Sequence, residues 1–154
     1  MLPTPNIFTL VAGAGEGSTK LNSFDRALLV AKIHNVNLVK VSSILPPGAS
    51  YVEEIILPPG SLVPTAYGAL TSTNPGEIVS AAVAVGIPEE GGFGVIMEYA
   101  GYTTQKEAEE IISGMVREAF TIRGLQIAKY MVKSIEHKVE KAGTVFAGVV
   151  LWYK

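Results

Sequence analysis

Asn37-Leu38-Val39-Lys40-Val41-Ser42-Ser43-Ile44-Leu45-Pro46-Pro47 is the stretch around which the rest of this chain is organised. An apolar, β-branched run leads to two adjacent serines, and a pair of prolines follows them. Each proline fixes its own φ at about −65°, and Pro46 also disfavours helical backbone at the residue before it. We therefore expect the peptide bond between Ser42 and Ser43 to lie at a strand end with a rigid exit. Such a bond is well held for attack by a neighbouring hydroxyl, although an ordinary turn has the same residues.

The length and composition indicate one globular unit. The chain has 154 residues, which predicts a single domain over residues 1–154. Apolar residues make up 48% and charged residues 17%, yet no apolar run approaches the length of about 20 residues that spans a bilayer. We attribute this apolar surplus to buried strands or to interfaces between subunits, and therefore expect a homo-oligomer without a membrane partner.

Several functional classes are excluded or disfavoured by the residues that are present. The chain has no cysteine, which excludes disulfides, thiol nucleophiles and thiolate metal sites. A net charge of −2 without a basic cluster argues against nucleic acid as a partner. His34 and His137 lack motif partners for a catalytic triad or a metal site, so we expect no metal. The first residues do not resemble a signal peptide, which favours the cytoplasm.

Hydrophobic patterning predicts an α+β fold with few helices and many strands. Short turn signals make the three central strands antiparallel neighbours, and two sheets packed face to face would bury the apolar strands. With a helix on each outer face, this is a four-layer α/β/β/α sandwich of mainly antiparallel sheets. We expect strands over residues 7–12, 37–42, 62–71, 76–87, 93–99, 125–139 and 144–153, and helices over residues 22–34 and 104–124.

The helix termini and the glycine loop each have a structural interpretation. Thr104 and Glu107 form a capping box, and Gly124 ends the helix that follows. Asn22 or Ser23 would cap the first helix, which places Asp25 in its first turn, where a carboxylate favours the helix dipole. Residues 13–18 (GAGEGS) invite a dinucleotide interpretation, but the third glycine of the fingerprint is a serine, so a tight turn is favoured.

Glu98 is the most unusual ionisable residue. Strand alternation places it on the same face as Ile96, and an ionised carboxylate on an apolar face is costly unless it is paired. Without a partner its pKa rises, and it can hold a proton at neutral pH as a general acid does. A cross-strand salt bridge or an interface contact explains the pattern equally well.

Residues 35–47 (NVNLVKVSSILPP) closely resemble the self-cleavage segment of the pyruvoyl-dependent arginine decarboxylases. Ordered matches of this kind are much more specific than a Ser-Ser dipeptide. They extend over nearly the whole chain, in LVAG (10–13), GEG (15–17), LNSFD (21–25), LVPTAYG (62–68), PGE (75–77), IMEY (96–99) and LWYK (151–154).

The resemblance implies an activity and a cofactor. In such enzymes the Ser43 hydroxyl would attack the Ser42 carbonyl, and the chain would separate into residues 1–42 (β chain) and 43–154 (α chain). Ser43 would become a covalent pyruvoyl group, which forms a Schiff base with L-arginine and yields agmatine and CO₂. The resemblance further implies trimers, or multiples of trimers, with sites between subunits.

Residue roles follow from the same resemblance. Ser43 supplies the pyruvoyl group, and Glu98 is the expected proton donor. Asn37 is the expected polar group that positions the processing site, and Asp25 is expected to receive the guanidinium group of the substrate. Leu28, close to Asp25 along the helix, would line the same pocket.

Two other hypotheses remain open from the residues. The first is a pyruvoyl enzyme that decarboxylates another amino acid, such as histidine or aspartate, although an anionic pocket at Asp25 favours a cationic substrate. The second is a non-catalytic oligomeric sandwich that binds a small molecule through its glycine loop. The sequence also leaves open the extent of self-processing, the oligomer number, and whether agmatine serves polyamine biosynthesis or acid resistance.

Overall fold

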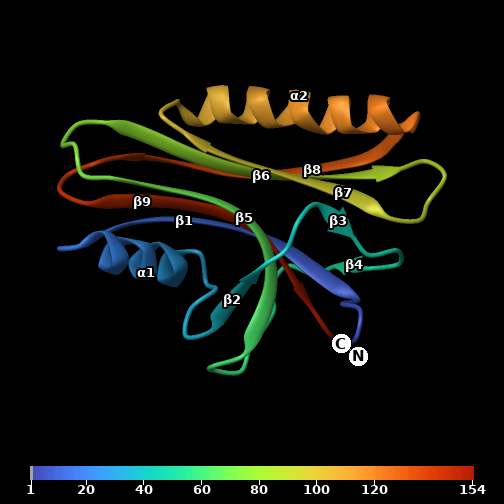
Figure 1. The fold of residues 1–154 in the computed structure, drawn as a ribbon, viewed down its shortest axis with the longest axis horizontal. Helices are drawn as coiled ribbons and strands as arrows, with labels where there is room; N and C mark the ends of the chain where they lie inside the picture. Colours follow the sequence, from blue (N-terminus) through green and yellow to red (C-terminus); the bar gives the residue numbers. More distant parts are fainter. Residues whose placement is uncertain (1) are drawn as a thin grey trace.

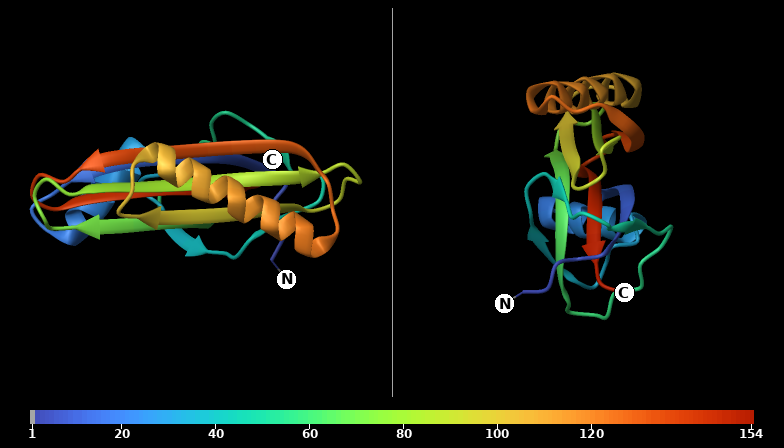
Figure 2. Two further views of the ribbon diagram at one scale, coloured as in Figure 1. Left: turned by 90° about the horizontal axis from the view of Figure 1, so that it is seen from above. Right: turned by 90° about the vertical axis from the view of Figure 1, so that its right-hand side faces the viewer.

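The computed structural model describes residues 2–154 as two packed sheets with one helix on each outer face. Figure 1 shows the four layers in succession: helix α2 (Gln105–Arg123), a four-stranded sheet, a five-stranded sheet and helix α1 (Lys20–Val30). The side view in Figure 2 shows the two helices on opposite sides of the paired sheets. The predicted α/β/β/α sandwich is therefore confirmed.

The five-stranded sheet contains the first and the last strand of the chain. Its central strand, β9, pairs antiparallel with β1 and β5, whereas the short edge strands β2 and β4 run parallel to their neighbours. The order across the sheet is β2 (Asn37–Lys40), β5 (Leu62–Ser72), β9 (Gly143–Trp152), β1 (Ile7–Glu16) and β4 (Ser50–Tyr51).

The four-stranded sheet is antiparallel throughout, in the order β3 (Ile44–Leu45), β7 (Gly94–Gly101), β6 (Ile78–Pro88) and β8 (Ile127–Lys138). The predicted pairing of residues 62–71 with residues 76–87 is wrong, because β5 and β6 belong to different sheets. The intervening turn contains Gly76 at φ +87° and leads from one sheet to the other. Turn residues indicate a reversal, but they do not distinguish a hairpin from a step between layers.

The main core lies between the sheets. Buried residues from β6 and β9, including Val83 and Val149, meet there and exclude water. A second cluster joins β6 and β7 to α2, and a third joins β5 and β9 to α1. Both helices are thus held by their apolar faces, as the periodic pattern predicts.

The second helix begins and ends as predicted, but the first helix differs. The Thr104–Glu107 capping box is present, and Gly124 adopts the left-handed conformation at the end of α2. Thr19, not Asn22 or Ser23, caps α1, because its hydroxyl oxygen accepts a hydrogen bond of 3.1 Å from the Asn22 backbone.

The earlier start of α1 changes the position of Asp25. This residue is no longer in the first turn of the helix, which contains no acidic residue, so the predicted role of Asp25 at the helix dipole is wrong. The helix also ends at Val30, short of the expected His34, because the backbone turns to positive φ at Lys32 (61°).

The first four residues of the predicted glycine loop, 13–16, instead continue strand β1. A Cβ atom at Gly13 would lie 2.5 Å from the Ala27 carbonyl oxygen, and one at Gly15 would lie 2.7 Å from the Ala27 nitrogen. Glycine is therefore needed so that α1 can pack directly on the strand backbone. These glycines serve helix packing, which removes the basis for a phosphate-binding loop.

A polar contact joins the two sheets at the end of β1. His137 Nε2 lies 2.5 Å from Glu16 Oε2, and Glu16 also accepts backbone hydrogen bonds from Glu140 and Lys141. Burial works to raise the pKa of Glu16, but these hydrogen bonds favour the charged form, and the pKa is lowered overall.

No helix within residues 2–154 is long and apolar enough to cross a bilayer.

Candidate active site

The Ser42–Ser43 peptide bond lies where the chain passes from one sheet to the other. Just before it, the Val41 backbone N–H donates a 3.1 Å hydrogen bond to the Thr65 carbonyl on β5. Just after it, the Ser43 carbonyl accepts a 2.7 Å hydrogen bond from the Ile96 N–H on β7. Each side of the bond is therefore attached to a different sheet.

The segment connects β2 and β3, which are edge strands of the two sheets (Figure 1). Ser42 is exposed and Ser43 is half-buried, whereas Leu45 is almost completely buried. Val39 and Ile44 expose 43% of their surface each, so apolar side chains flank the serines on the outside. This combination of a fixed backbone and an apolar exposed rim suits a site that another surface covers.

Glu98 faces the space between the sheets, as strand alternation predicts. Ile96, on the same face of β7, is fully buried in the core between the sheets, while Met97 and Tyr99 pack towards α2. The residue opposite Glu98 on β6 is Val83, so the structure does not show a cross-strand salt bridge between β7 and β6.

The electrostatic environment of Glu98 favours its neutral form. Burial raises the pKa of the Glu98 carboxyl, and the positive charge of Lys40 only partly opposes this rise. The Lys40 ammonium group is held 4.7 Å from the centre of the Tyr67 ring. Glu98 can therefore retain a proton at a higher pH than an ordinary glutamate, as a proton donor requires.

Asn37 starts β2 and is exposed. Its side-chain amide donates a hydrogen bond of 3.3 Å to the Gly60 carbonyl, and its backbone N–H donates to Ser61. The amide is thus occupied by the neighbouring turn in a single chain. A bond of this length is at the weak end of the range, so the amide can exchange it for another partner at small cost.

Asp25 and Leu28 lie on α1, which packs on the outer face of the five-stranded sheet and not on β3 or β7. Asp25 is exposed in a shallow groove that also contains Asn22 and Arg26. Leu28 is 8% exposed and packs in the core beneath the helix. The structure therefore attaches Ser43 to β7, the strand that carries Glu98, whereas Asp25 of the same chain lies on α1, which does not pack on β7.

The sequence interpretation missed the surroundings of Asp25. Leu21 and Leu29 precede and follow it by four residues on the same helix face, and they are 77% and 47% exposed. Exposed leucines at this spacing, on either side of a carboxylate, form an apolar surface with an anionic centre. The i, i+4 spacing of the two leucines is visible in the sequence, but the same segment also carries the apolar stripe that packs against the sheet.

Residues 7–154 match the family described as pyruvoyl-dependent arginine decarboxylase. This match includes both serines, Asn37, Asp25 and Glu98. The chain belongs to this family.

Curated relatives agree with this assignment. The chain is 50% identical over 151 residues to the pyruvoyl-dependent arginine decarboxylase of Methanocaldococcus jannaschii, covering 97% of this chain and 92% of the relative. It is 50% identical to that of Methanococcus aeolicus with the same coverage. It is 44% identical to that of Pyrococcus abyssi, covering 97% of this chain and 96% of the relative.

One solved structure is also similar in part. It is described as the structure of pyruvoyl-dependent histidine decarboxylase at pH 8, with a TM-score of 0.49 and 15% identity. The similarity covers 64% of this chain and 53% of that chain.

The Ser42–Ser43 segment fits the formation of a pyruvoyl group in this decarboxylase family. A serine is required at the position that becomes the ketone, and a peptide carbonyl must precede it within reach of the hydroxyl. Ser43 meets the first requirement, and Ser42 supplies the carbonyl. The two flanking hydrogen bonds limit movement of the backbone, which keeps nucleophile and carbonyl together.

Proposed function

We propose that this arginine decarboxylase cuts its own chain between Ser42 and Ser43 and carries its pyruvoyl group at residue 43. The observation that supports the proposal best is the attachment of the two sides of this bond to different sheets, through Thr65 and Ile96. The enzyme then converts L-arginine to agmatine and CO₂.

The cleavage needs only the atoms of the two serines and water. The Ser43 hydroxyl oxygen attacks the Ser42 carbonyl carbon, and the amide bond is replaced by an ester as the proton moves to the Ser43 nitrogen. Loss of the Cα proton and of the ester oxygen leaves Ser42 with a free carboxylate and residue 43 with a Cα=Cβ bond. Addition of water and loss of ammonia complete a ketone at residue 43.

Both products are expected to stay in place after the cut. The fragment of residues 1–42 contains β1, α1 and β2, which remain hydrogen-bonded to β9 and β5 of the other fragment. The fragment of residues 43–154 begins just before β3, which pairs with β7. The cut therefore releases no element from either sheet.

The bound ketone supplies an electron-withdrawing carbonyl to the substrate amine, and the chain supplies the proton and the binding groups. Burial keeps the Glu98 carboxyl protonated to a higher pH than usual, and Ile96, two residues earlier on β7, is hydrogen-bonded to residue 43. We assign Glu98 as the donor of the proton that replaces the departing carboxylate. Asn37 is retained as the proposed polar group that orients the processing site.

The substrate side chain needs a second surface. Asp25 between Leu21 and Leu29 offers a carboxylate for the guanidinium group and apolar surface for the methylene chain. Leu28, one turn after Asp25 and mostly buried beneath the helix, is retained as the proposed apolar residue that lines the same pocket. Because α1 and β3 lie on different parts of one chain, we propose that Asp25 of one copy completes the site at Ser43 of the next.

Two different surfaces that meet between copies form a head-to-tail contact, and a closed ring of such contacts has cyclic symmetry. A trimer, or a multiple of trimers, is the assembly we propose. The exposed residues Val39 and Ile44 around the serines and Leu21 and Leu29 around Asp25 would be covered together. A cytoplasmic location remains our proposal, in keeping with a chain that has no cysteine.

Co-expression of two inactive variants tests the shared site. Asp25→Ala keeps Ser43 but lacks the guanidinium partner, and Ser43→Ala keeps Asp25 but forms no ketone. Separately each should be almost inactive. In mixed rings, a site that combines the intact Ser43 of one copy with the intact Asp25 of the next should occur in about one quarter of positions.

Activity near this fraction of the wild type would support the shared site. Activity no greater than the sum of the separate variants would contradict it. The control is the doubly substituted chain co-expressed with Ser43→Ala, which should remain inactive at any ratio because no copy forms a ketone.

A further inference from the structure

A cavity lies away from the serines, at the opposite edge of the five-stranded sheet. Its volume is about 430 Å³, which is in the range of small-molecule sites. Strand β1, the end of α1 and the segment after β4 form its walls. Strands β2 and β3 flank the serines, whereas β1 and β4 lie across the sheet from them.

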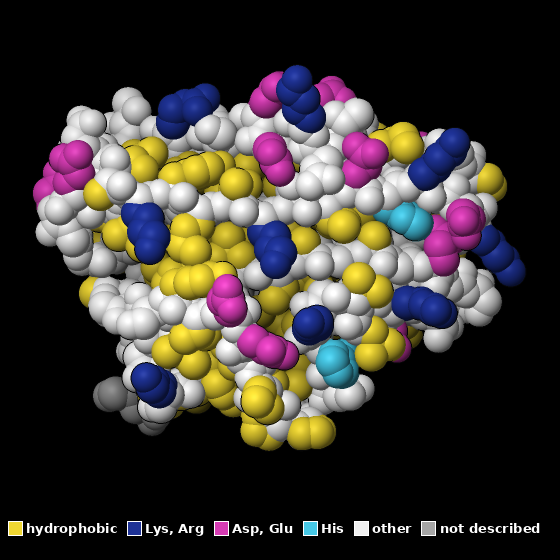
Figure 3. Space-filling view, turned by 180° about the vertical axis from the view of Figure 1, so that it is seen from behind, with side chains coloured by type: hydrophobic (Ala, Val, Ile, Leu, Met, Phe, Trp, Pro, Cys, Tyr) yellow, Lys and Arg dark blue, Asp and Glu magenta, His cyan; other side chains and the backbone are white. Residues whose placement is uncertain are grey.

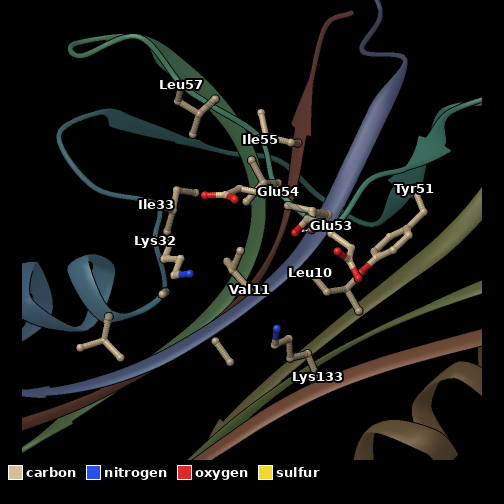
Figure 4. A pocket seen from close by; sticks show the side chains of 15 residues that line it. Leu10, Val11, Lys32, Ile33, Tyr51, Glu53, Glu54, Ile55, Leu57 and Lys133 are labelled. Carbon is tan, nitrogen blue, oxygen red and sulfur yellow. Dashed lines mark hydrogen bonds between the residues drawn. The ribbon is translucent and has the colours of Figure 1, made fainter.

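Two amines and two carboxylates surround this cavity. Lys32 and Lys133 lie below Glu53 and Glu54 in Figure 4, and their amino groups point into the space between. In the part of the chain that the structure describes, the one ion pair is the distant contact of His137 with Glu16. None of the four charged groups is therefore in an ion pair within the described residues, and all four side chains are exposed around the cavity.

Lys32 lies at the end of α1, where the backbone leaves the helix beside the cavity. Lys32 has φ +61°, in the left-handed region that favours glycine, just after α1. The other helix ends with Gly124 at φ +66°, which satisfies the same geometry without a side chain. The Lys32 and Ile33 N–H groups donate hydrogen bonds to the Leu29 and Leu28 carbonyls, which ends α1 and fixes the point at which the exposed Lys32 side chain leaves the backbone beside the cavity.

The wall opposite the lysines, formed by the segment after β4, is held by hydrogen bonds within the chain. The Val52 N–H donates a 2.9 Å hydrogen bond to the Phe8 carbonyl, and the Thr9 hydroxyl donates a 3.1 Å bond to the Glu53 carbonyl. The backbone that carries Glu53 and Glu54 is thus attached to β1. A wall fixed before binding lowers the entropy cost of holding a ligand.

The space between the charges is lined with aliphatic side chains from both walls, namely Leu10, Val11, Ile33, Ile55 and Leu57. Acidic and basic side chains also lie close together around exposed apolar side chains on the rear face of the molecule (Figure 3). Such a lining suits a short methylene chain with a charged group at each end.

We propose that this cavity is a second, non-catalytic binding site for an amino-acid zwitterion with a cationic side chain. The ligand carboxylate contacts Lys32 and Lys133, its cationic groups contact Glu53 and Glu54, and its methylene chain lies against the leucine and isoleucine side chains. The substrate class of the enzyme has these features, whereas a decarboxylated product lacks the carboxylate. The site therefore distinguishes substrate from product by charge.

Methyl NMR titration of the full-length Ser43→Ala chain tests this proposal without turnover. L-Arginine should shift the methyl signals of Ile33, Ile55 and Leu57. The signals of Leu21 and Leu29 report separately on the groove at Asp25. Agmatine, which has no carboxylate, should bind to the cavity at least tenfold more weakly than arginine.

A lysine variant and a matched control complete the test. The double substitution Lys32→Met and Lys133→Met should weaken arginine binding at the cavity methyl groups at least tenfold. Lys106→Met with Lys141→Met removes the same charge elsewhere and should leave that binding unchanged. Absent shifts, equal affinity for agmatine, or equal effects of the two double variants would overturn the proposal. A second copy found in contact with these methyl groups in solution would overturn it as well.

Discussion

The backbone N–H of Ile96 donates a 2.7 Å hydrogen bond to the carbonyl oxygen of Ser43. This bond attaches the start of the 43–154 segment to the strand that carries Glu98. The residue that we propose to be cut and the residue that we propose to donate a proton therefore depend on one strand for their relative positions. Processing and catalysis should respond together to changes in that strand.

Ile96→Pro should slow or abolish self-cleavage. Proline lacks the N–H that binds the Ser43 carbonyl. Because this N–H points towards β3, its loss does not remove a hydrogen bond between β7 and β6. Denaturing gel electrophoresis of freshly purified protein should show mainly the uncut chain. Ile96→Val keeps the N–H and should be cut normally. Normal cutting of a folded proline variant would show that this bond is not needed.

The Glu98→Gln chain should fold and cleave between Ser42 and Ser43. Its turnover should fall about 100-fold or more, which is the usual contribution of a general acid. Glutamine has the shape of glutamic acid and no acidic proton. Carbon dioxide release measures turnover, and arginine binding to a borohydride-reduced sample measures affinity, which should change little. Turnover at the wild-type rate would exclude Glu98 as the donor.

The same substitution should change how stability depends on pH. Burial raises the pKa of Glu98 above its ordinary value of 4.5, so the folded chain keeps a proton that the unfolded chain releases. Its contribution to stability is complete below pH 4.5 and is lost as the pH rises through the folded-state pKa. Urea denaturation should therefore show Glu98→Gln to be more stable than the wild type at pH 8 and similar to it near pH 4. An equal difference at both values would contradict this explanation.

The glycines of β1 should be needed for helix packing. Gly15→Ala would place a Cβ atom 2.7 Å from the Ala27 nitrogen and should destabilise the fold by about 1–3 kcal/mol. The matched control is Gly114→Ala in α2, where the nearest atom would be 3.8 Å away and helix propensity should add about 0.5–1 kcal/mol. Urea denaturation at pH 7 measures both. Equal effects of the two alanines would refute the packing role.

The layers of the fold were predictable because they depend on patterns within single segments. The helix stripes, the capping box at Thr104 and the alternation around Ile96 and Glu98 each report which side of an element is buried. Contacts between segments were not predictable in this way. The assignment of β5 and β6 to different sheets depends on packing across the sandwich, and the glycines of β1 are explained only by α1 lying against them.

The candidate site was predictable in its residue types but not in its arrangement. Ser42, Ser43 and Glu98 are distinguished in the sequence by their neighbours and by the family resemblance. The hydrogen bonds of Thr65 and Ile96 that hold the bond involve backbone groups, which have no sequence signature. The separation of Asp25 from Ser43 required the three-dimensional structure, and it is the reason for proposing a site shared by two copies.

Denaturing mass spectrometry of the purified, active protein is the most direct test of the central claim. We predict two polypeptides, residues 1–42 ending in a free carboxylate and residues 43–154 starting with a ketone that borohydride reduces. The Ser43→Ala variant should give one chain of 16.3 kDa. A fully active wild-type sample that contains only the intact 16.3 kDa chain would contradict the account.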